Sequence, residues 1–204
     1  MIINGITGYS ASMRKSSKTL SGFMDDVLAA MPDVPKNINK QIISSLSDKC
    51  VEDSLRFLYA FPDTRILLVG KSMGAVKTWW LLTKYWTNVL QRISVRGARL
   101  GVVLIDPHGW CDGDGRVGSY GVRLKNLGFE DGWARDNMRI ACLRQRNKYP
   151  KGAGLAVPRG VTNAKNVKLK GDADHWKVTN INTDAGRRVS FEIQSTIRWL
   201  MEDL

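Results

Sequence analysis

The sequence is poor in cysteine and contains no long apolar run. Its three cysteines, Cys50, Cys111 and Cys142, are an odd number at spacings that fit neither a disulfide framework nor a metal site. No apolar stretch approaches the length that crosses a bilayer, and the first residues lack the basic and apolar regions of a signal peptide. We therefore expect a cytoplasmic protein without a transmembrane segment, metal or cofactor, whose release from a cell would need lysis or a leaderless route.

Acidic residues are also few. Lysine and arginine number 31 against 19 aspartates and glutamates, which gives a formal net charge of +12 at pH 7. Between residues 139 and 170, nine basic residues occur without a single acidic one. This charge fits either a solvated basic face or a surface that binds an anionic lipid or glycan. No motif of a nucleic-acid-binding module accompanies it, so we expect no specific nucleic-acid partner.

Apolar periodicity divides the chain into alternating strands and helices. At 204 residues and 43% hydrophobic content, the chain is long enough to form one domain, 1–204, around a single core. The alternation predicts a doubly wound, mostly parallel α/β sheet with helices on both faces. The expected strands are 2–4, 66–69, 100–105, 140–143 and 166–169; the expected helices are 16–30, 38–60, 73–90 and 185–202, and residues 107–135 are expected to be irregular.

A Gly-x-Ser-x-Gly pentapeptide is the most informative motif. Residues 70–74 read Gly-Lys-Ser-Met-Gly and lie between a β-branched apolar run and a helical pattern. A serine on such a strand-to-helix turn is typical of a nucleophile elbow, in which the flanking glycines let strand and helix pass closely. Two other interpretations exist: a phosphate-binding P-loop, which requires glycine where Arg65 stands, and a tight turn whose serine does no chemistry.

A nucleophilic serine needs a base, and the chain contains only two histidines. His175 follows the last expected strand and precedes the last expected helix, so it falls at the edge of the sheet where Ser72 is expected. His108 follows Asp106 by two positions, and we assign it to the surface or to substrate contact. We therefore expect His175 to be the base.

The acid that orients the histidine is assigned to Asp106. Asp106 ends the apolar strand 100–105, whereas the turn after the next strand, 144–148, contains no carboxylate. Asp112 and Asp114 lie deeper in the glycine-rich segment. Asp172 and Asp174 are near His175 in the sequence and fit helix or turn caps.

The order of Ser72, Asp106 and His175 on alternating elements resembles the α/β-hydrolase superfamily. The acid one strand after the elbow, in an Ile-Asp-Pro context, is similar to that of lipases of the pancreatic type. The small size resembles cutinase-like members without a large cap domain. The resemblance implies a serine esterase, lipase or thioesterase that acts through an acyl-enzyme.

The resemblance also implies an oxyanion hole. One donor would be the backbone N–H of Met73, directly after the nucleophile. The other would lie in the loop after the first strand, where Asn-Gly-Ile-Thr-Gly at 4–8 resembles the His-Gly-x-x-Gly form of that loop. By that alignment the second donor would be Ile6 or Thr7.

Aromatic residues on the loops at this edge would either form an apolar acyl pocket or pack the fold: Trp110, Tyr120, Trp133 and Trp176. The leading hypothesis is a serine hydrolase that cleaves a carboxylic ester. A lipid or an anionic acylated molecule fits as substrate, and a simple neutral ester fits equally. One alternative is a thioesterase, peptidase or acyltransferase with the same three residues. Another is a non-catalytic hydrolase-like module that binds an anionic polymer.

Overall fold

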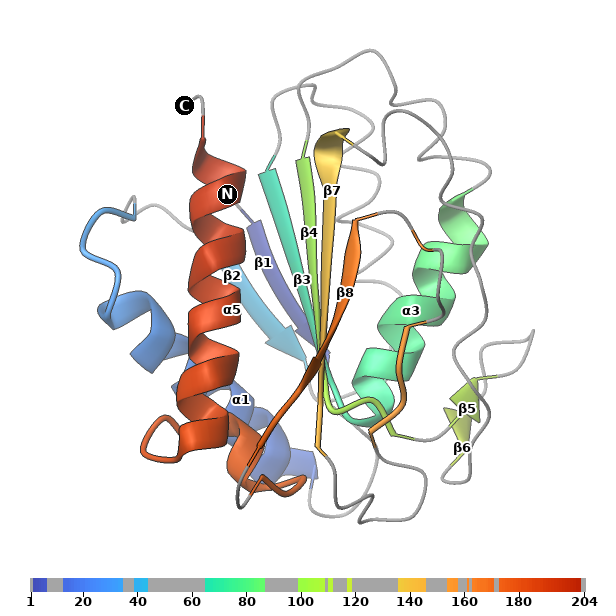
Figure 1. Ribbon diagram of the computed structural model, residues 1–204, viewed down its shortest axis with the longest axis horizontal. Helices are drawn as coiled ribbons and strands as arrows, with labels where there is room; N and C mark the ends of the chain where they lie inside the picture. The colour runs from blue at the N-terminus through green and yellow to red at the C-terminus, as the bar shows by residue number, and fades with distance from the viewer. Residues whose placement is uncertain are drawn as a thin grey trace.

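The fold is built from short strands that alternate with helices. The computed structural model describes residues 2–6, 13–34, 39–43, 65–86, 99–108, 110–111, 117–118, 136–145, 154–157, 161, 163–170 and 173–202 of the chain. Its elements, in chain order, are β1 (Ile2–Ile6), α1 (Met13–Ala29), β2 (Asn39–Ile43), β3 (Arg65–Lys71), α3 (Met73–Trp86), β4 (Arg99–Ile105), β5 (Trp110–Cys111), β6 (Val117–Gly118), β7 (Met138–Arg144), β8 (Ala164–Lys168), η2 (Lys177–Thr179) and α5 (Asp184–Met201) (Figure 1).

The strands β2, β1, β3, β4, β7 and β8 form one sheet in that order, and every neighbouring pair is parallel. The chain therefore has an α/β fold, as the alternation predicted. From β1 the chain moves outward to β2 and then returns to the other side of β1 to form β3. Open parallel sheets bind ligands at the carboxyl ends of strands beside such a reversal, and Ser72 follows β3 at this point.

Helices cover both faces of the sheet. In Figure 1, α1 and α5 lie on one face and α3 lies on the other. Alternate residues of β3, β4 and β7 enter an apolar cluster under α1 and α5: Leu67, Val69, Val103, Ile105, Ala141 and Leu143. Strands that are buried on both faces read as continuous apolar runs, which is why these three strands can be recognised in the sequence.

Two expectations from the sequence differ from the structure. Residues 39–43, expected as the start of a helix over 38–60, form the edge strand β2, which pairs with β1. Residues 39–43 read Asn-Lys-Gln-Ile-Ile, and so short a segment with two adjacent apolar residues fits either periodicity; the pairing with β1 favours the strand. Residues 44–64 lie outside the described part of the chain. Within the segment expected to be irregular, β5 and β6 form a short antiparallel pair.

The other expected strands and helices are confirmed in type, with ends displaced by a few residues. Cys142 lies in β7 and is fully buried, where it packs as a small core residue. On α5, four apolar residues at helical spacing are fully buried: Val189, Ile193, Ile197 and Leu200.

Candidate active site

Ser72 occupies the turn between the last residue of β3 and the first residue of α3. Its φ of 60° lies in the left-handed region, which a non-glycine residue occupies only where the surrounding structure enforces it. The Ser72 N–H donates to the Ile105 carbonyl at 2.9 Å. The Ser72 carbonyl accepts from the N–H groups of Ala75 and His108 at 3.0 and 3.2 Å. These backbone contacts fix the serine at the carboxyl end of the sheet.

Gly70 allows the strand and the helix to approach closely at this turn. A Cβ atom on Gly70 would lie 2.6 Å from the Ala75 Cα atom and 2.9 Å from the Gly74 carbonyl oxygen. Both are backbone atoms, so they could not move aside as the end of a side chain can. The first glycine of the motif is therefore required by the packing of β3 against α3.

His175 reaches Ser72 from the segment between β8 and α5. Its side chain is buried, and its Nε2 atom lies 2.8 Å from Ser72 Oγ. Its Nδ1 atom lies 2.5 Å from Asp106 Oδ2. With the ring proton on Nδ1, the imidazole donates to Asp106 and accepts from the Ser72 hydroxyl. The structure thus brings the three residues selected from the sequence into one hydrogen-bonded chain.

Asp106 follows β4 in a second strained turn and is completely buried, with a φ of 44°. Its N–H donates to the Leu143 carbonyl at 2.6 Å. Gln145, the residue after β7, donates from Nε2 to Asp106 Oδ2 at 2.7 Å and from its backbone N–H to Oδ1 at 3.3 Å. This turn lacks a carboxylate, as the sequence shows, but the role of Gln145 in holding the acid was not predicted. The available signal was an amide side chain at the end of the strand beside β4.

Asp174 fixes the turn that follows His175. Its Oδ1 atom accepts from the N–H groups of Trp176 and Lys177, both at 2.8 Å. Asp174 is therefore a turn cap, which is one of the roles that its position suggested. Asp172 lies outside the described residues.

Two rings pack edge-on against the His175 imidazole. The ring centroid of His108 lies 5.6 Å away and that of Trp176 lies 5.4 Å away. Trp176 is 60% exposed although it is adjacent to a buried histidine. These contacts restrict rotation of the imidazole, and Trp176 leaves an apolar surface available beside it.

Three other predicted site residues belong to described strands or helices. Met73 is the first residue of α3, so its N–H has no acceptor within the helix. Ile6 is the last residue of β1 and is level with the first glycine of the elbow on β3. Trp110 forms part of β5. Three further residues lie outside the described part of the chain: Thr7, Tyr120 and Trp133.

A cationic cavity of about 580 Å³ lies between the end of β8 and the first turns of α5. Its lining includes Lys168, Lys170 and Arg188, with Asp184 as the acidic member. Asp184 is itself paired with the guanidinium of Arg187. Because all strands of the six-stranded sheet are parallel, the cavity at the end of β8 lies at the same edge of that sheet as Ser72.

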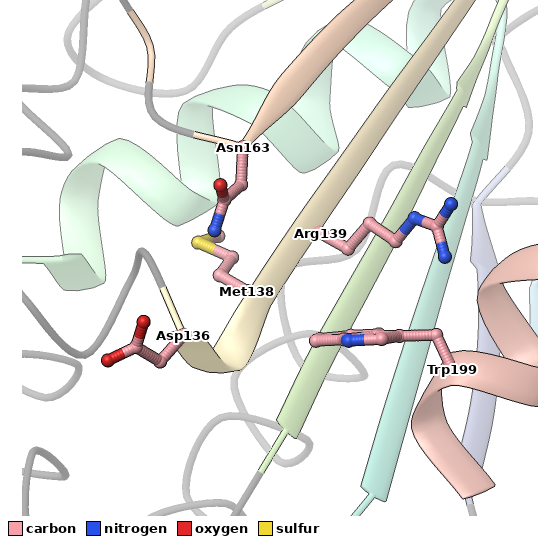
Figure 2. A pocket seen from close by; sticks show the side chains of 5 residues that line it. All are labelled: Asp136, Met138, Arg139, Asn163 and Trp199. Atoms are coloured by element: carbon pink, nitrogen blue, oxygen red, sulfur yellow. The ribbon is translucent and has the colours of Figure 1, made fainter. Parts of the chain in front are cut away.

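A second cavity, of about 310 Å³, lies at the opposite edge of the sheet (Figure 2). Figure 2 shows Asp136 and Asn163 near Met138 on one side of β7, with Arg139 and Trp199 on the other side. None of these five residues belongs to the predicted site. A strand of this length separates the two edges by about 20 Å, so this cavity is remote from Ser72.

Burial changes the ionisation of two groups near the strand ends. Burial raises the pKa of the Cys142 thiol to about 12. Burial also lowers the pKa of Lys71 to about 8, against the attraction of Asp106 and Asp174. Among the described residues, no three histidine, cysteine, aspartate or glutamate side chains gather in a way that could hold a metal ion. No helix in the same part of the chain has the length and apolar character to span a membrane.

Comparisons with known proteins give structural likenesses. No protein-family model matches the chain, and no curated protein matches it. The crystal structure of ClbQ from the colibactin NRPS/PKS pathway aligns over 98% of this chain and 98% of that chain, with 11% identity and a TM-score of 0.46. A chain in the structure of the Tle1 effector bound to the VgrG spike from the Type 6 secretion system aligns over 82% of this chain and 49% of that chain, with 13% identity and a TM-score of 0.36.

Proposed function

We propose that this protein is a serine hydrolase that cleaves a carboxylic ester through an acyl-enzyme intermediate. The proposal depends on the hydrogen-bonded chain from Ser72 through His175 to Asp106, with contacts of 2.8 and 2.5 Å. A serine hydroxyl is a poor nucleophile at neutral pH. A histidine that accepts its proton, oriented by a buried carboxylate, makes it reactive. Positive φ angles at both Ser72 and Asp106 support the proposal, because backbone strain of this kind gathers at functional sites.

The reaction would proceed in two halves. Ser72 Oγ attacks the carbonyl carbon of the ester while its proton passes to His175 Nε2. The C–O bond to the alcohol then breaks, and the alcohol leaves with that proton. Water next gives a proton to Nε2, attacks the acyl-enzyme and releases the carboxylic acid, and the proton returns to Ser72. Asp106 holds the ring and stabilises the imidazolium that forms in each half.

Backbone N–H groups would stabilise the oxyanion of each tetrahedral intermediate. Met73 opens α3, so both its N–H and the positive end of the helix dipole favour a negative charge there. Ile6 would supply the second N–H from the end of β1, the strand beside β3. Donors of this kind are each worth on the order of 100- to 1000-fold in rate.

The cationic cavity favours a substrate that carries an anionic group. Neighbouring strands lie about 4.8 Å apart, and β8 is three strands from β3, so the cavity lies roughly 14 Å along the edge from Ser72. An acylated lipid or glycan is long enough to span that distance. The exposed ring of Trp176 would contact its apolar part, and Lys168 and Lys170 would contact its anionic part.

Fluorophosphonate labelling of the purified protein tests the proposal. We expect stoichiometric labelling, located at Ser72 by mass spectrometry, and no labelling of Ser72→Ala. The matched control is Ser190→Ala, because Ser190 is a buried serine on α5, and this variant should label like the wild type. Folded wild-type protein that does not label would contradict the proposal and favour a non-catalytic module that binds an anionic polymer.

Substrate panels then define the bond and the class of substrate. Ester, thioester and amide substrates with the same acyl group separate an esterase from a thioesterase or a peptidase, and an added alcohol or amine acceptor detects acyl transfer. An anionic and a neutral ester of equal acyl length test the role of the cationic cavity. The value of kcat/KM for the anionic ester should fall as salt screens the cavity, whereas that for the neutral ester should not.

A further inference from the structure

Lys71, the residue before Ser72, is a lysine in a core position. Side chains alternate along a strand, so Lys71 shares the face of Leu67 and Val69, which enter the apolar cluster under α1 and α5. Only 2% of its surface is exposed. Lysines are almost never buried to this extent without a partner for the ammonium group.

The Lys71 ammonium is bonded to the turn that follows His175. Its Nζ atom donates to Thr179 Oγ1 at 2.7 Å, and Thr179 is itself buried. Thr179 is the last residue of η2, the short helix that begins after His175 and Trp176. The bond therefore connects the end of β3, which leads into Ser72, with the segment that carries the histidine.

Two carboxylates hold His175 in place, and both attract Lys71. Asp106 contacts the imidazole Nδ1 atom at 2.5 Å, and Asp174 caps the turn after the histidine through two backbone N–H groups at 2.8 Å. The Nζ atom of Lys177 also lies 3.9 Å from Asp174 Oδ2. Within the described part of the chain, the charges that act on Lys71 are those of these two carboxylates, and His175 and Lys177 lie beyond them.

Lys71 loses its charge within the range of an ordinary pH profile. Burial, the largest effect, lowers its pKa to about 8, and the attraction of Asp106 and Asp174 opposes that decrease. The ammonium is therefore mostly present at neutral pH. Above pH 8 the amine becomes neutral, and its attraction for the two carboxylates is lost.

We propose that Lys71 is a positioning residue whose buried ammonium joins the serine turn to the histidine turn and balances the two carboxylates that hold His175. The inference rests on the proposed function, because it gives Lys71 a role in the same site. This connection between the two turns keeps the Nε2 atom of His175 within hydrogen-bond distance of Ser72 Oγ. A displacement of about 1 Å at such a contact can lower a rate about 100-fold.

Four variants separate the charge of Lys71 from its packing. Lys71→Met removes the charge and the donor at similar length, and Lys71→Arg keeps a cation that does not titrate in this range. Thr179→Val removes the acceptor and keeps its shape. Lys77→Met is the matched control, since Lys77 is a buried lysine of α3 whose Nζ lies 4.4 Å from the centroid of the Trp80 ring.

Hydrogen exchange of the backbone amides of residues 174–180 at pH 7 measures how firmly the turn after His175 is held, and it requires no catalytic activity. We expect faster exchange in Lys71→Met and Thr179→Val, and wild-type exchange in Lys77→Met. Fluorophosphonate labelling at pH 7 should be about 10- to 100-fold slower in Lys71→Met, with partial recovery in Lys71→Arg. Between pH 7 and 9.5, the labelling rate of the wild type divided by that of either Lys71 variant should fall, with a midpoint near pH 8.

Exchange and labelling that remain unchanged in Lys71→Met would overturn the proposal. The proposal would also be overturned if Lys71→Met and Lys71→Arg lowered the labelling rate equally and both kept the wild-type pH dependence. The effect would then come from packing and not from the charge. If the wild type is never labelled but amide exchange of residues 174–180 still depends on Lys71, the positioning role of Lys71 is supported and the proposed hydrolase function is contradicted. If labelling is absent and exchange does not depend on Lys71, both are overturned.

Discussion

The Nε2 atom of His175 lies 2.8 Å from the Oγ atom of Ser72, although 103 positions separate the two residues in the chain. Ser72 belongs to the turn after β3, whereas His175 follows β8, three strands away in the sheet. The segment after β8 must therefore return across the ends of β7 and β4, and His175 contacts Asp106 there. Parallel strand ends place the residues at one edge, but the cap formed by Asp174 sets the turn that brings them into contact.

Replacement of Asp106 by asparagine should lower the kcat of ester hydrolysis by roughly four orders of magnitude. The NH₂ group of the asparagine competes with its oxygen for the Nδ1 atom of His175. When the NH₂ group donates to Nδ1, the ring proton lies on Nε2, and the Ser72 hydroxyl has no acceptor. Asp26→Asn, at an exposed aspartate of α1, is the matched control and should keep the wild-type rate. A decrease of less than tenfold in Asp106→Asn would mean that another group orients His175.

Gln145 offers a second position for the acid. Its Nε2 atom lies 2.7 Å from Asp106 Oδ2, the oxygen that also contacts His175. The double variant Asp106→Asn with Gln145→Glu should therefore have a kcat at least about tenfold higher than that of Asp106→Asn alone. In the wild-type background, Gln145→Glu should lower the Tm at neutral pH, because two carboxylates this close cannot both ionise without cost. Absence of any recovery would show that a carboxylate after β7 cannot support the imidazole.

The elements that carry the site could be predicted because each has a strong local signal. The buried strands β3 and β4 are continuous apolar runs, and the elbow requires its glycines. The strand β2 could not be predicted, because its pairing with β1 rather than its own pattern decides its type. The contacts of Gln145 and Lys71 span 39 and 108 positions. Such roles depend on which strand ends are neighbours, and a local sequence pattern does not contain that information.

Gly70 and Gly22 should respond in opposite directions to replacement by alanine. The new Cβ atom at Gly70 would lie 2.6 Å from the Ala75 Cα atom, so Gly70→Ala should lower the free energy of unfolding by roughly 1–3 kcal/mol. Gly22 is an exposed residue of α1 with nothing within 4 Å of an added Cβ atom. Gly22→Ala should therefore raise the free energy of unfolding by about 0.5–1 kcal/mol. Urea denaturation measures both, and a neutral Gly70→Ala would contradict the close packing of β3 on α3.

Cys142 should resist thiol reagents in the folded protein. It is fully buried in β7, and burial raises its pKa to about 12, so the reactive thiolate is scarce at pH 8. Iodoacetamide treatment followed by peptide mapping should leave Cys142 unmodified in buffer and modify it in guanidinium chloride. Rapid modification in buffer would indicate that β7 opens to solvent.

Lys71 should make the free energy of unfolding rise with pH above neutrality. Its pKa in the folded protein is about 8, below the ordinary value of 10.5, so the folded chain releases this proton first. Between these two values the unfolded chain binds more protons, and the free energy of unfolding rises over that window by at most about 3 kcal/mol. Lys71→Met lacks this contribution, so its stability relative to the wild type should be greatest at pH 7 and should fall toward pH 10. Urea denaturation at pH 7, 8.5 and 10 measures the difference, with Lys77→Met as the control. A difference that stays constant over this window would contradict a buried ammonium at Lys71.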